Sequence, residues 1–299
     1  MLRPQRFELE VDPGPVQIQA RNVRFETADK PMSWIPEHPV ASHLVNLLNI
    51  LLPAGERWFI EVFNEALPLI KDPKLAEDVR GFIGQEAMHA EAHDTVMHDY
   101  LVDSGLDVDP LLGQIEYIFE TVLGPTKATN PRRKMNHLIE RLWLIAAIEH
   151  FTAVLGDFVL NCTWDEYDAD PTLVDLYRWH GAEEVEHRSV AHDVATYFRD
   201  SYLTRIRAMA VVGAGFYAIF QRGMRFLVKS DPQLNLTWWQ IQRLRMRDSK
   251  LGLLPKYRNL LFKQTLVYFL PGYSPEDMGS TAQAVAYLAN SPAARAAHH

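Results

Sequence analysis

The spacing of apolar residues divides the chain into a short extended part and a long helical part. Residues 7–26 alternate apolar and polar positions around the turn signal Asp12-Pro13-Gly14-Pro15, which predicts a short N-terminal β-hairpin. Beyond Ala41 the apolar spacing changes to three and four residues, the period of an amphipathic helix. This pattern predicts helices over about 41–68, 73–104, 110–123, 132–162, 171–199 and 203–229.

Proline and glycine stand where these helices are expected to begin or end, as at Asp72-Pro73, Gly124-Pro125 and Asp170-Pro171. After Pro232 a basic amphipathic helix is predicted over about 236–249, followed by a Leu-rich segment at 251–270 and a turn at 271–275. We therefore expect an all-α fold with one domain overall. Its parts would be an N-terminal hairpin extension (1–40), a helical bundle (41–200) and C-terminal helices packed on the bundle (201–299).

Four of the predicted helices carry glutamates on the face that their own apolar residues mark as buried. In the first, Glu56 shares the stripe of Leu52, Phe59 and Phe63, whereas Glu61 falls on another face. The stripes of the other three include Glu86 and His89, then Glu149, then His180, Glu184 and His187. Lys and Arg are absent from these stripes, and an unpaired buried carboxylate is very costly. Metal binding is the economical explanation.

The order and spacing of these residues indicate a dinuclear centre. Glu86-Ala-Met-His89 and Glu184-Val-Glu-His187 are both Glu-x-x-His, and one inward glutamate precedes each motif by 30 and 35 residues. This is the ligand set of a carboxylate-bridged pair of ions inside a four-helix bundle. We predict that two ions are held by Glu56, Glu86, His89, Glu149, Glu184 and His187, with Glu86 and Glu184 as the bridges.

Other histidines and a tyrosine lie on or near the same stripes. His180 is one turn before Glu184, where it is either a third imidazole ligand or a core histidine with a hydrogen bond, and both readings stay open. His93 is less favoured as a ligand, and Tyr177 is expected to be a packed core residue. Two further histidines are offset from the stripes by about 100° and are read as ordinary, namely His150 and His192.

These motifs resemble those of the ferritin-like di-iron carboxylate superfamily over residues 41–199. The segment Leu52-Pro53-Ala54-Gly55-Glu56-Arg57-Trp58-Phe59, together with the two Glu-x-x-His helices, is more closely similar to the bacterial family named "predicted metal-dependent hydrolase". In the monooxygenases of this superfamily an Asp precedes each Glu-x-x-His and orients its histidine, whereas Gln85 and Glu183 stand at those positions here. The resemblance to aminoarene N-oxygenases, which have an extra histidine in the fourth helix, implies that His180 is a ligand.

Composition and charge narrow the classes of protein that fit. The 299 residues are 47 % apolar, which suits a folded soluble chain, and the net charge of −8 argues against nucleic-acid binding. The lone Cys162 excludes an internal disulfide framework, and Met1 to Asp12 contain no secretory apolar run, so we expect a cytoplasmic protein. The apolar stretch Ala208 to Phe220 has 13 residues, too few to span a bilayer. It predicts a buried helix, or at most an interfacial one.

The donor set favours iron, with manganese and zinc as alternatives, because it has four carboxylates, two or three imidazoles and no thiolate. We expect a di-iron oxidase or oxygenase that uses O2 on a small, largely apolar organic substrate and takes electrons from that substrate or an external donor. A two-metal hydrolase and a non-catalytic iron-binding protein are the alternatives. For Thr237 to Arg247, a solvated helix is favoured over contact with an anionic membrane or with an acidic electron donor. A homodimer is left open.

Overall fold

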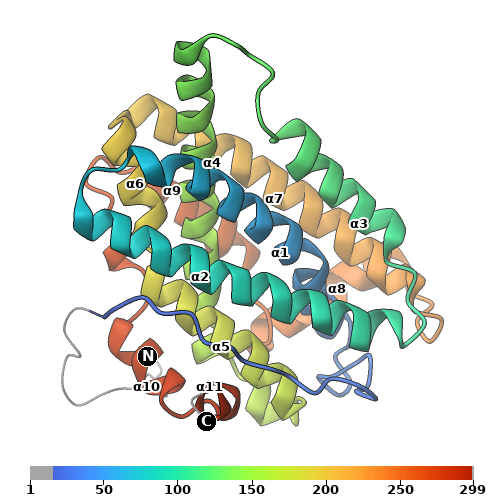
Figure 1. Cartoon of the computed structure of the whole chain (residues 1–299). Coiled ribbons are helices and arrows are strands. Elements are labelled where there is room, and N and C mark those ends of the chain that lie inside the picture. The colour runs from blue at the N-terminus through green and yellow to red at the C-terminus, as the bar shows by residue number, and fades with distance from the viewer. Residues whose placement is uncertain (1–15, 298–299) are drawn as a thin grey trace.

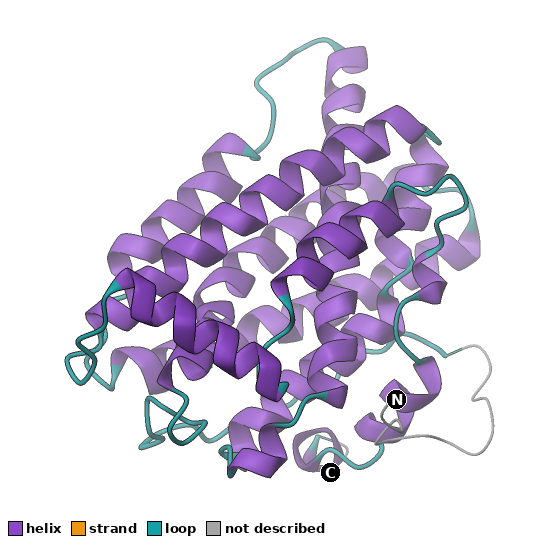
Figure 2. Cartoon of the chain, turned by 180° about the vertical axis from the view of Figure 1, so that it is seen from behind, coloured by secondary structure: helices purple, strands orange, loops and turns teal. Residues whose placement is uncertain are grey.

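A computed structural model describes residues 16–297, and within this range it contains helices and loops but no β-strand (Figure 2). The predicted all-α fold is therefore confirmed. Four long helices surround its centre (Figure 1), and their bounds are α1 (Pro39–Ala66), α2 (Pro73–Val96), α4 (Pro131–Asn161) and α5 (Pro171–His187). α1 packs against α2, α4 packs against α5, and contacts of α1 with α4 and of α2 with α5 close the bundle.

The helix starts follow the breakers seen in the sequence. α2, α4 and α5 each begin with a proline, whose missing N–H is not needed in the first turn. The residues before these prolines are Asp72, Asn130 and Asp170, and each side chain accepts a backbone N–H of that first turn. Pro53 lies inside α1 without ending it.

The N-terminal hairpin is not present in the part of the chain that the structure describes. Residues 16–26 run as an extended segment without strand pairing, and the predicted first strand and turn lie outside the described residues. The segment crosses α5 (Figure 1) and touches α2 at Gly81, where an added Cβ would lie 2.5 Å from the carbonyl oxygen of Ile18. The alternation of Val23 and Phe25 with exposed neighbours thus reflects packing on helices, because one side of an extended segment can also face a helical surface.

The helix predicted over 171–199 is two helices in the structure. α5 ends at His187, and α6 (Val190–Phe198) begins after Arg188 and Ser189. No proline or glycine marks this break, so apolar spacing alone could not reveal it. The predicted helices over 73–104 and 110–123 end in π-helical turns, with bounds η2 (Met97–Val102) after α2, and α3 (Asp109–Glu116) followed by η3 (Tyr117–Val122).

The C-terminal helices cover two sides of the bundle. α7 (Tyr202–Ser230) packs on α1 and α4, and α10 (Thr281–Leu288) and α11 (Pro292–Ala296) pack on α5. Along the chain, α7 is followed by α8 (Trp238–Leu251), η5 (Arg258–Lys263) and α9 (Gln264–Tyr268), which precede α10. Short 3-10 turns complete the described elements, and these are η1 (Leu67–Leu69), η4 (Trp164–Tyr167) and η6 (Pro275–Asp277).

α4 and α7 are long and apolar enough to cross a membrane by length and composition, but they differ in burial. The most apolar window of α4 is 67 % buried, as expected of a core helix, whereas that of α7 is 22 % buried. The expectation of a buried helix over Ala208 to Phe220 is therefore wrong for its outer side, where Val211 and Tyr217 are 58 % and 50 % exposed. The bundle covers only one side of α7.

Candidate metal centre

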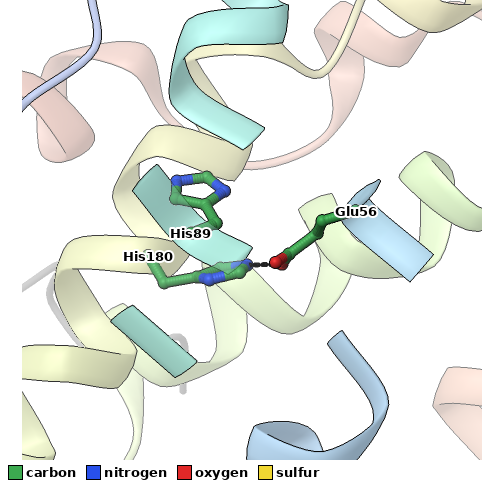
Figure 3. A group of neighbouring side chains, drawn as sticks. All are labelled: Glu56, His89 and His180. Carbon is green, nitrogen blue, oxygen red and sulfur yellow. Dashed lines mark ion pairs between the residues drawn. The ribbon is translucent and has the colours of Figure 1, made fainter. Parts of the chain in front are cut away.

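All seven side chains singled out as ligands point into the centre of the bundle and are buried. Their donor atoms form two groups, and within each group the atoms lie within 4.8 Å of one another. The first group is Glu56, His89 and His180, and the second is Glu86, Glu149, Glu184 and His187. Four helices contribute, since α1 carries Glu56, α2 carries Glu86 and His89, α4 carries Glu149, and α5 carries the other three. Figure 3 shows the first group, in which His180 points toward Glu56 and His89 lies beside them.

Glu184 faces both groups with its two oxygens. Its Oε1 is 2.9 Å from Nε2 of His180 and 3.6 Å from Nδ1 of His89. Its Oε2 is 3.3 Å from Nε2 of His187, which in turn is 3.2 Å from Oε2 of Glu149. Donor atoms that share one ion at about 2.0–2.3 Å lie at such separations from each other. Glu184 thus has the position of a bridge between two ions. Glu86, the other predicted bridge, is grouped with the second set only, since its Oε1 is 3.3 Å from Nε2 of His187 but 4.0 Å from Nδ1 of His89.

Several of these buried donor atoms have no hydrogen-bond partner among the described residues. They are both carboxylate oxygens of Glu56, both of Glu86, Oε2 of Glu149 and Nδ1 of His89. Buried polar atoms are normally satisfied, and leaving one unpaired costs about 1–3 kcal/mol, more for a charged group. Oxygen and imidazole donors that are otherwise unpaired are suitable ligands for divalent metal ions. These glutamates and histidines therefore fit the metal ions that the sequence pattern implies.

Two of the histidines are oriented by residues of the opposite helix. Nε2 of His89 on α2 donates to Oε2 of Glu183 on α5 at 3.0 Å, which leaves Nδ1 for the centre. Nδ1 of His187 on α5 donates to Oε1 of Gln85 on α2 at 2.9 Å, which leaves Nε2 for the centre. Gln85 and Glu183 therefore do orient histidines, but each serves the motif on the other helix. Such outer hydrogen bonds fix the ring tautomer in metal sites.

The N-terminal segment supports this outer layer through Arg21. Its guanidinium donates to Glu183 at 2.7 Å and to both oxygens of Glu186 at 2.9 and 3.1 Å. Glu186 also accepts from Nε2 of Gln85 at 3.0 Å. One arginine thus connects the residues that hold both histidines. No sequence pattern indicates this role, because Arg21 is distant along the chain and lies in a segment that is predicted to be a hairpin.

His180 is held by a chain of hydrogen bonds that leads away from the centre. Nδ2 of Asn49 donates to the hydroxyl of Tyr177 at 2.9 Å, and its Oδ1 accepts from Nδ1 of His93 at 2.7 Å. Neutral His93 then accepts at Nε2 from Nδ1 of His180, at 2.8 Å. This pattern leaves Nε2 of His180 facing Glu56 and Glu184, where it lies within hydrogen-bond distance of Glu184 in the metal-free chain and would present its lone pair to a bound ion. His93 is in neither donor group, and the sequence pointed to no role for Asn49.

When no metal is present, the pKa values of the side chains in the centre are shifted in different directions. Burial, with the nearby carboxylates, raises the pKa values of Glu56 and Glu86 well above their usual range, and burial raises the pKa of Glu149 to about 7. Although burial opposes it, the charge of His187 and hydrogen bonds from both neighbouring histidines hold the pKa of Glu184 well below its usual range. Despite burial, Glu184 and Glu149 raise the pKa of His187. Binding a cation would therefore displace protons.

An apolar cavity of about 240 Å³ reaches the centre from the surface. Glu56, Glu86 and Glu184 lie at its inner end, beside the hydroxyl-bearing Thr152. The rest of its lining is apolar and comes from α1, η3, α4 and α7. The exposed lining residues are Val122 and Val211, so the mouth lies between η3 and α7. The cavity suits a molecule with an apolar body and one polar group at the inner end.

The remaining residues of interest lie away from the donor groups. Glu61 is exposed, in agreement with the stripe analysis. His150 is hydrogen-bonded to the hydroxyl of Tyr273 and the carbonyl of Gln264 at 2.9 and 3.1 Å, and burial lowers its pKa to about 4. Tyr177 is buried and packs on Trp34 and Trp164.

The sequence matches one protein-family model, described as "Predicted metal-dependent hydrolase", over residues 19–279. No curated protein and no solved structure matches the chain. The matched range contains the N-terminal segment with Arg21, all four bundle helices and the two donor groups. A buried cluster of glutamates and histidines is what metal dependence requires. The chain therefore belongs to the family of predicted metal-dependent hydrolases.

Proposed function

We propose that the protein is a dinuclear metalloenzyme that hydrolyses a small substrate with a largely apolar body. The observation that carries this proposal is the pair of donor groups joined by Glu184 at the closed end of an apolar cavity. Membership of a family described as metal-dependent hydrolases supports the reaction type. When bound, two divalent ions supply an activated water and an electrophilic site for hydrolysis.

The protein residues bind the ions, orient the histidine ligands and exclude bulk water from the site. We assign Glu56, His89 and His180 to one ion and Glu86, Glu149 and His187 to the other, with Glu184 shared between them. Glu183 and Gln85 keep the lone pairs of His89 and His187 directed inward. The apolar lining excludes bulk water and takes up the apolar part of the substrate, which leaves its polar group beside the carboxylates.

We further propose a ferritin-like bundle for the metal-binding part, because two Glu-x-x-His helices and two single-glutamate helices contribute donors in the order that this architecture uses. The same donor set favours O2 chemistry as the second candidate function. It has four carboxylates, three imidazoles and no thiolate, which favours iron or manganese over zinc.

Metal analysis combined with exposure to air distinguishes the two reactions. The protein is loaded anaerobically with Fe(II), and separately with Mn(II) or Zn(II), and is screened with ester and amide substrates that carry apolar groups. Hydrolysis with a redox-inactive ion, and no O2 uptake by the Fe(II) form, is the expected result. O2 consumption with an absorbance change, and no hydrolysis with any ion, would replace the hydrolase by the second candidate.

Replacement of the shared glutamate tests the dinuclear assignment. Glu184→Ala removes an oxygen donor from both groups, so the variant is expected to lose tight binding of both ions. Glu56→Ala removes a donor from one group and should retain one ion. Metal content per folded chain is the measurement, and the exposed Glu61→Ala serves as the control. A wild-type chain that binds a single ion would contradict the assignment.

A further inference from the structure

Exposed apolar side chains lie at the mouth of the cavity and on the elements that flank α7. Val122 of η3 and Val211 of α7 line the mouth and are 60 % and 58 % exposed. Tyr117 of η3, Tyr217 of α7, Phe262 of η5 and Leu266 of α9 are also at least half exposed. We call these six residues the mouth face. Large apolar residues are seldom gathered at a surface that meets only water.

The elements that carry the mouth face are neighbours in the fold. η3 and α7 both line the cavity, and α3, which leads into η3, runs beside α7 in Figure 1. On the other side of α7, the hydroxyl of Tyr202 donates to the carbonyl of Phe269 at 2.8 Å, and the ring of Tyr217 contacts Tyr257 at 6.3 Å between centroids. α7 thus lies between η3 and the η5–α9 segment, and its outer side is continuous with both.

Positive charge accompanies this apolar surface. Residues 201–270 contain twelve Lys and Arg against two Asp, a net charge of +10 in a chain whose total is −8. The two aspartates are buried and paired, Asp231 with His43 at 2.9 Å and Asp248 with His38 at 2.8 Å. Exposed cations lie on the same elements as the mouth face, among them Arg222 on α7 and Arg258 and Lys263 on η5. The charge of this segment is opposite to that of the rest of the molecule.

We propose that the mouth face docks on the surface of an anionic phospholipid bilayer, with the mouth of the cavity turned toward the acyl chains. Stable attachment at a membrane surface takes both apolar insertion and electrostatic attraction, and this surface offers both. α7 lies flat in such a pose, because its inner side is packed on α1 and α4. A second copy of the chain is a poorer occupant, since two-fold pairing would bring the same positive surfaces together.

Docking would also define where the substrate comes from. This consequence rests on the proposed hydrolase function. A molecule dissolved in the bilayer could pass between Val122 and Val211 to the carboxylates without crossing water. The substrate class is then a membrane-soluble compound with one hydrolysable polar group.

Sedimentation with lipid vesicles tests the docking itself, with no metal or turnover required. The full chain is expected to bind vesicles of equimolar phosphatidylcholine and phosphatidylglycerol, to bind phosphatidylcholine alone far less, and to be released by high salt. The double variant Phe262→Glu/Leu266→Glu should lose binding, whereas Val102→Glu, on η2 after α2, should not. All of these positions are exposed, so folding should be retained.

The electrostatic contribution to vesicle binding is tested with a second set of matched variants. Arg258→Glu/Lys263→Glu should weaken binding by about fivefold or more for each cation removed, and Lys71→Glu should leave it unchanged. Two results would overturn the proposal. One is equal sedimentation with neutral and anionic vesicles, or with none. The other is a stable dimer in solution that the Phe262 and Leu266 substitutions dissociate. Either result leaves the hydrolysis test untouched, because that test uses soluble substrates.

Discussion

At the scale of single residues, the centre depends on hydrogen bonds that point away from it. Each histidine of the donor groups uses one ring nitrogen to donate to a protein acceptor, and this leaves the other nitrogen with its lone pair directed inward. The acceptors differ, since they are the carboxylate of Glu183, the amide oxygen of Gln85 and the imidazole of His93. The last is unusual, because an imidazole accepts only while it is neutral. Burial, together with the neighbouring histidine charges, lowers the pKa of His93 well below its usual range, which keeps it neutral.

Replacement of His93 should therefore act on metal affinity through His180. His93→Ala removes the acceptor for Nδ1 of His180, so the ring can rotate or change tautomer. The ion at Glu56, His89 and His180 is expected to bind about 10–100-fold more weakly, as when other outer partners of ligands are removed. Calorimetric titration with Mn(II) would resolve the weakened step from the unchanged one. His98→Ala, on an exposed side chain, is the control, and equal weakening of both ions would contradict this role.

Metal affinity should rise with pH through about pH 7. Burial raises the pKa of Glu149 to about 7, so below this pH the carboxyl carries a proton that a cation must displace. The raised pKa values of Glu56, Glu86 and His187 act in the same direction. One or more protons should be released per chain at pH 6, and fewer at higher pH. Calorimetry in buffers of different ionisation enthalpy counts these protons, and affinity that is independent of pH would refute the expectation.

The donor residues were predictable because each lies on the apolar stripe of its own helix, where a carboxylate needs an explanation. Arg21 and Asn49 were not predictable. Asn49 is an ordinary polar residue on a helix, and its partners come from two other helices. Arg21 meets Glu183 and Glu186 across more than 160 positions of sequence. Spacing along one element cannot report a contact that exists only after several elements have packed.

At the scale of helices, the spacing between α4 and α5 is set by two glycines. A Cβ added to Gly156 would lie 2.4 Å from the carbonyl oxygen of Gly181, and one added to Gly181 would lie 2.9 Å from Cα of Gly156. No other residue type allows the two backbones to approach this closely. The contact is next to His180 and about one turn from Glu184 on α5, and it is two turns from Glu149 on α4, so it sets the distance between donors on the two helices.

Gly156→Ala should accordingly separate the helices. We expect a loss of about 1–3 kcal/mol in the free energy of unfolding, because the added methyl meets backbone and cannot be accommodated by a rotamer change. Gly113→Ala, on α3, is a matched control, since a Cβ there meets nothing within 4 Å and alanine favours a helix. Urea unfolding of both variants is the measurement. A Gly156 variant as stable as the wild type would show that the bundle can relax at this point.

Helix positions, that of α7 included, followed from apolar spacing and capping residues, but the conformation of the N-terminal segment and the burial of α7 did not. An extended segment that packs on helices has the same alternation as a strand, as Val23 and Phe25 show. In α7 the apolar residues suggested burial on both sides, yet Val211 and Tyr217 face outward. Apolar composition measures the tendency to leave water, and it does not identify the surface that will cover the residue.

At the scale of the whole molecule, the N-terminal segment connects α2 and α5. Gly81 and Gly84 allow it to lie close to α2, where an added Cβ would meet Ile18 and Ala20 at 2.5 and 3.2 Å. Arg21 reaches the carboxylates of Glu183 and Glu186 on α5, and both of these side chains are almost completely buried. The segment thus completes the wall behind the two Glu-x-x-His motifs.

Loss of Arg21 should therefore destabilise the whole fold. Arg21→Ala leaves two buried carboxylates without their cation, and breaking a buried pair in this way costs about 3–5 kcal/mol. Thermal unfolding should show a much lower midpoint than for Arg24→Ala, a neighbouring exposed arginine. Unfolding temperatures within error of each other for the two variants would show that the segment contributes little.

The crossed support of His89 and His187 has a consequence for the life of the protein in a cell. Because each imidazole is oriented from the other helix, neither helix alone presents a competent set of donors, and the unfolded chain has none. Occupancy of the centre is then linked to folding, and a free ion concentration one hundred times the dissociation constant adds about 2.7 kcal/mol to stability. Under metal starvation the chain would open more often and be degraded sooner, so its abundance would follow the supply of the ion that it uses.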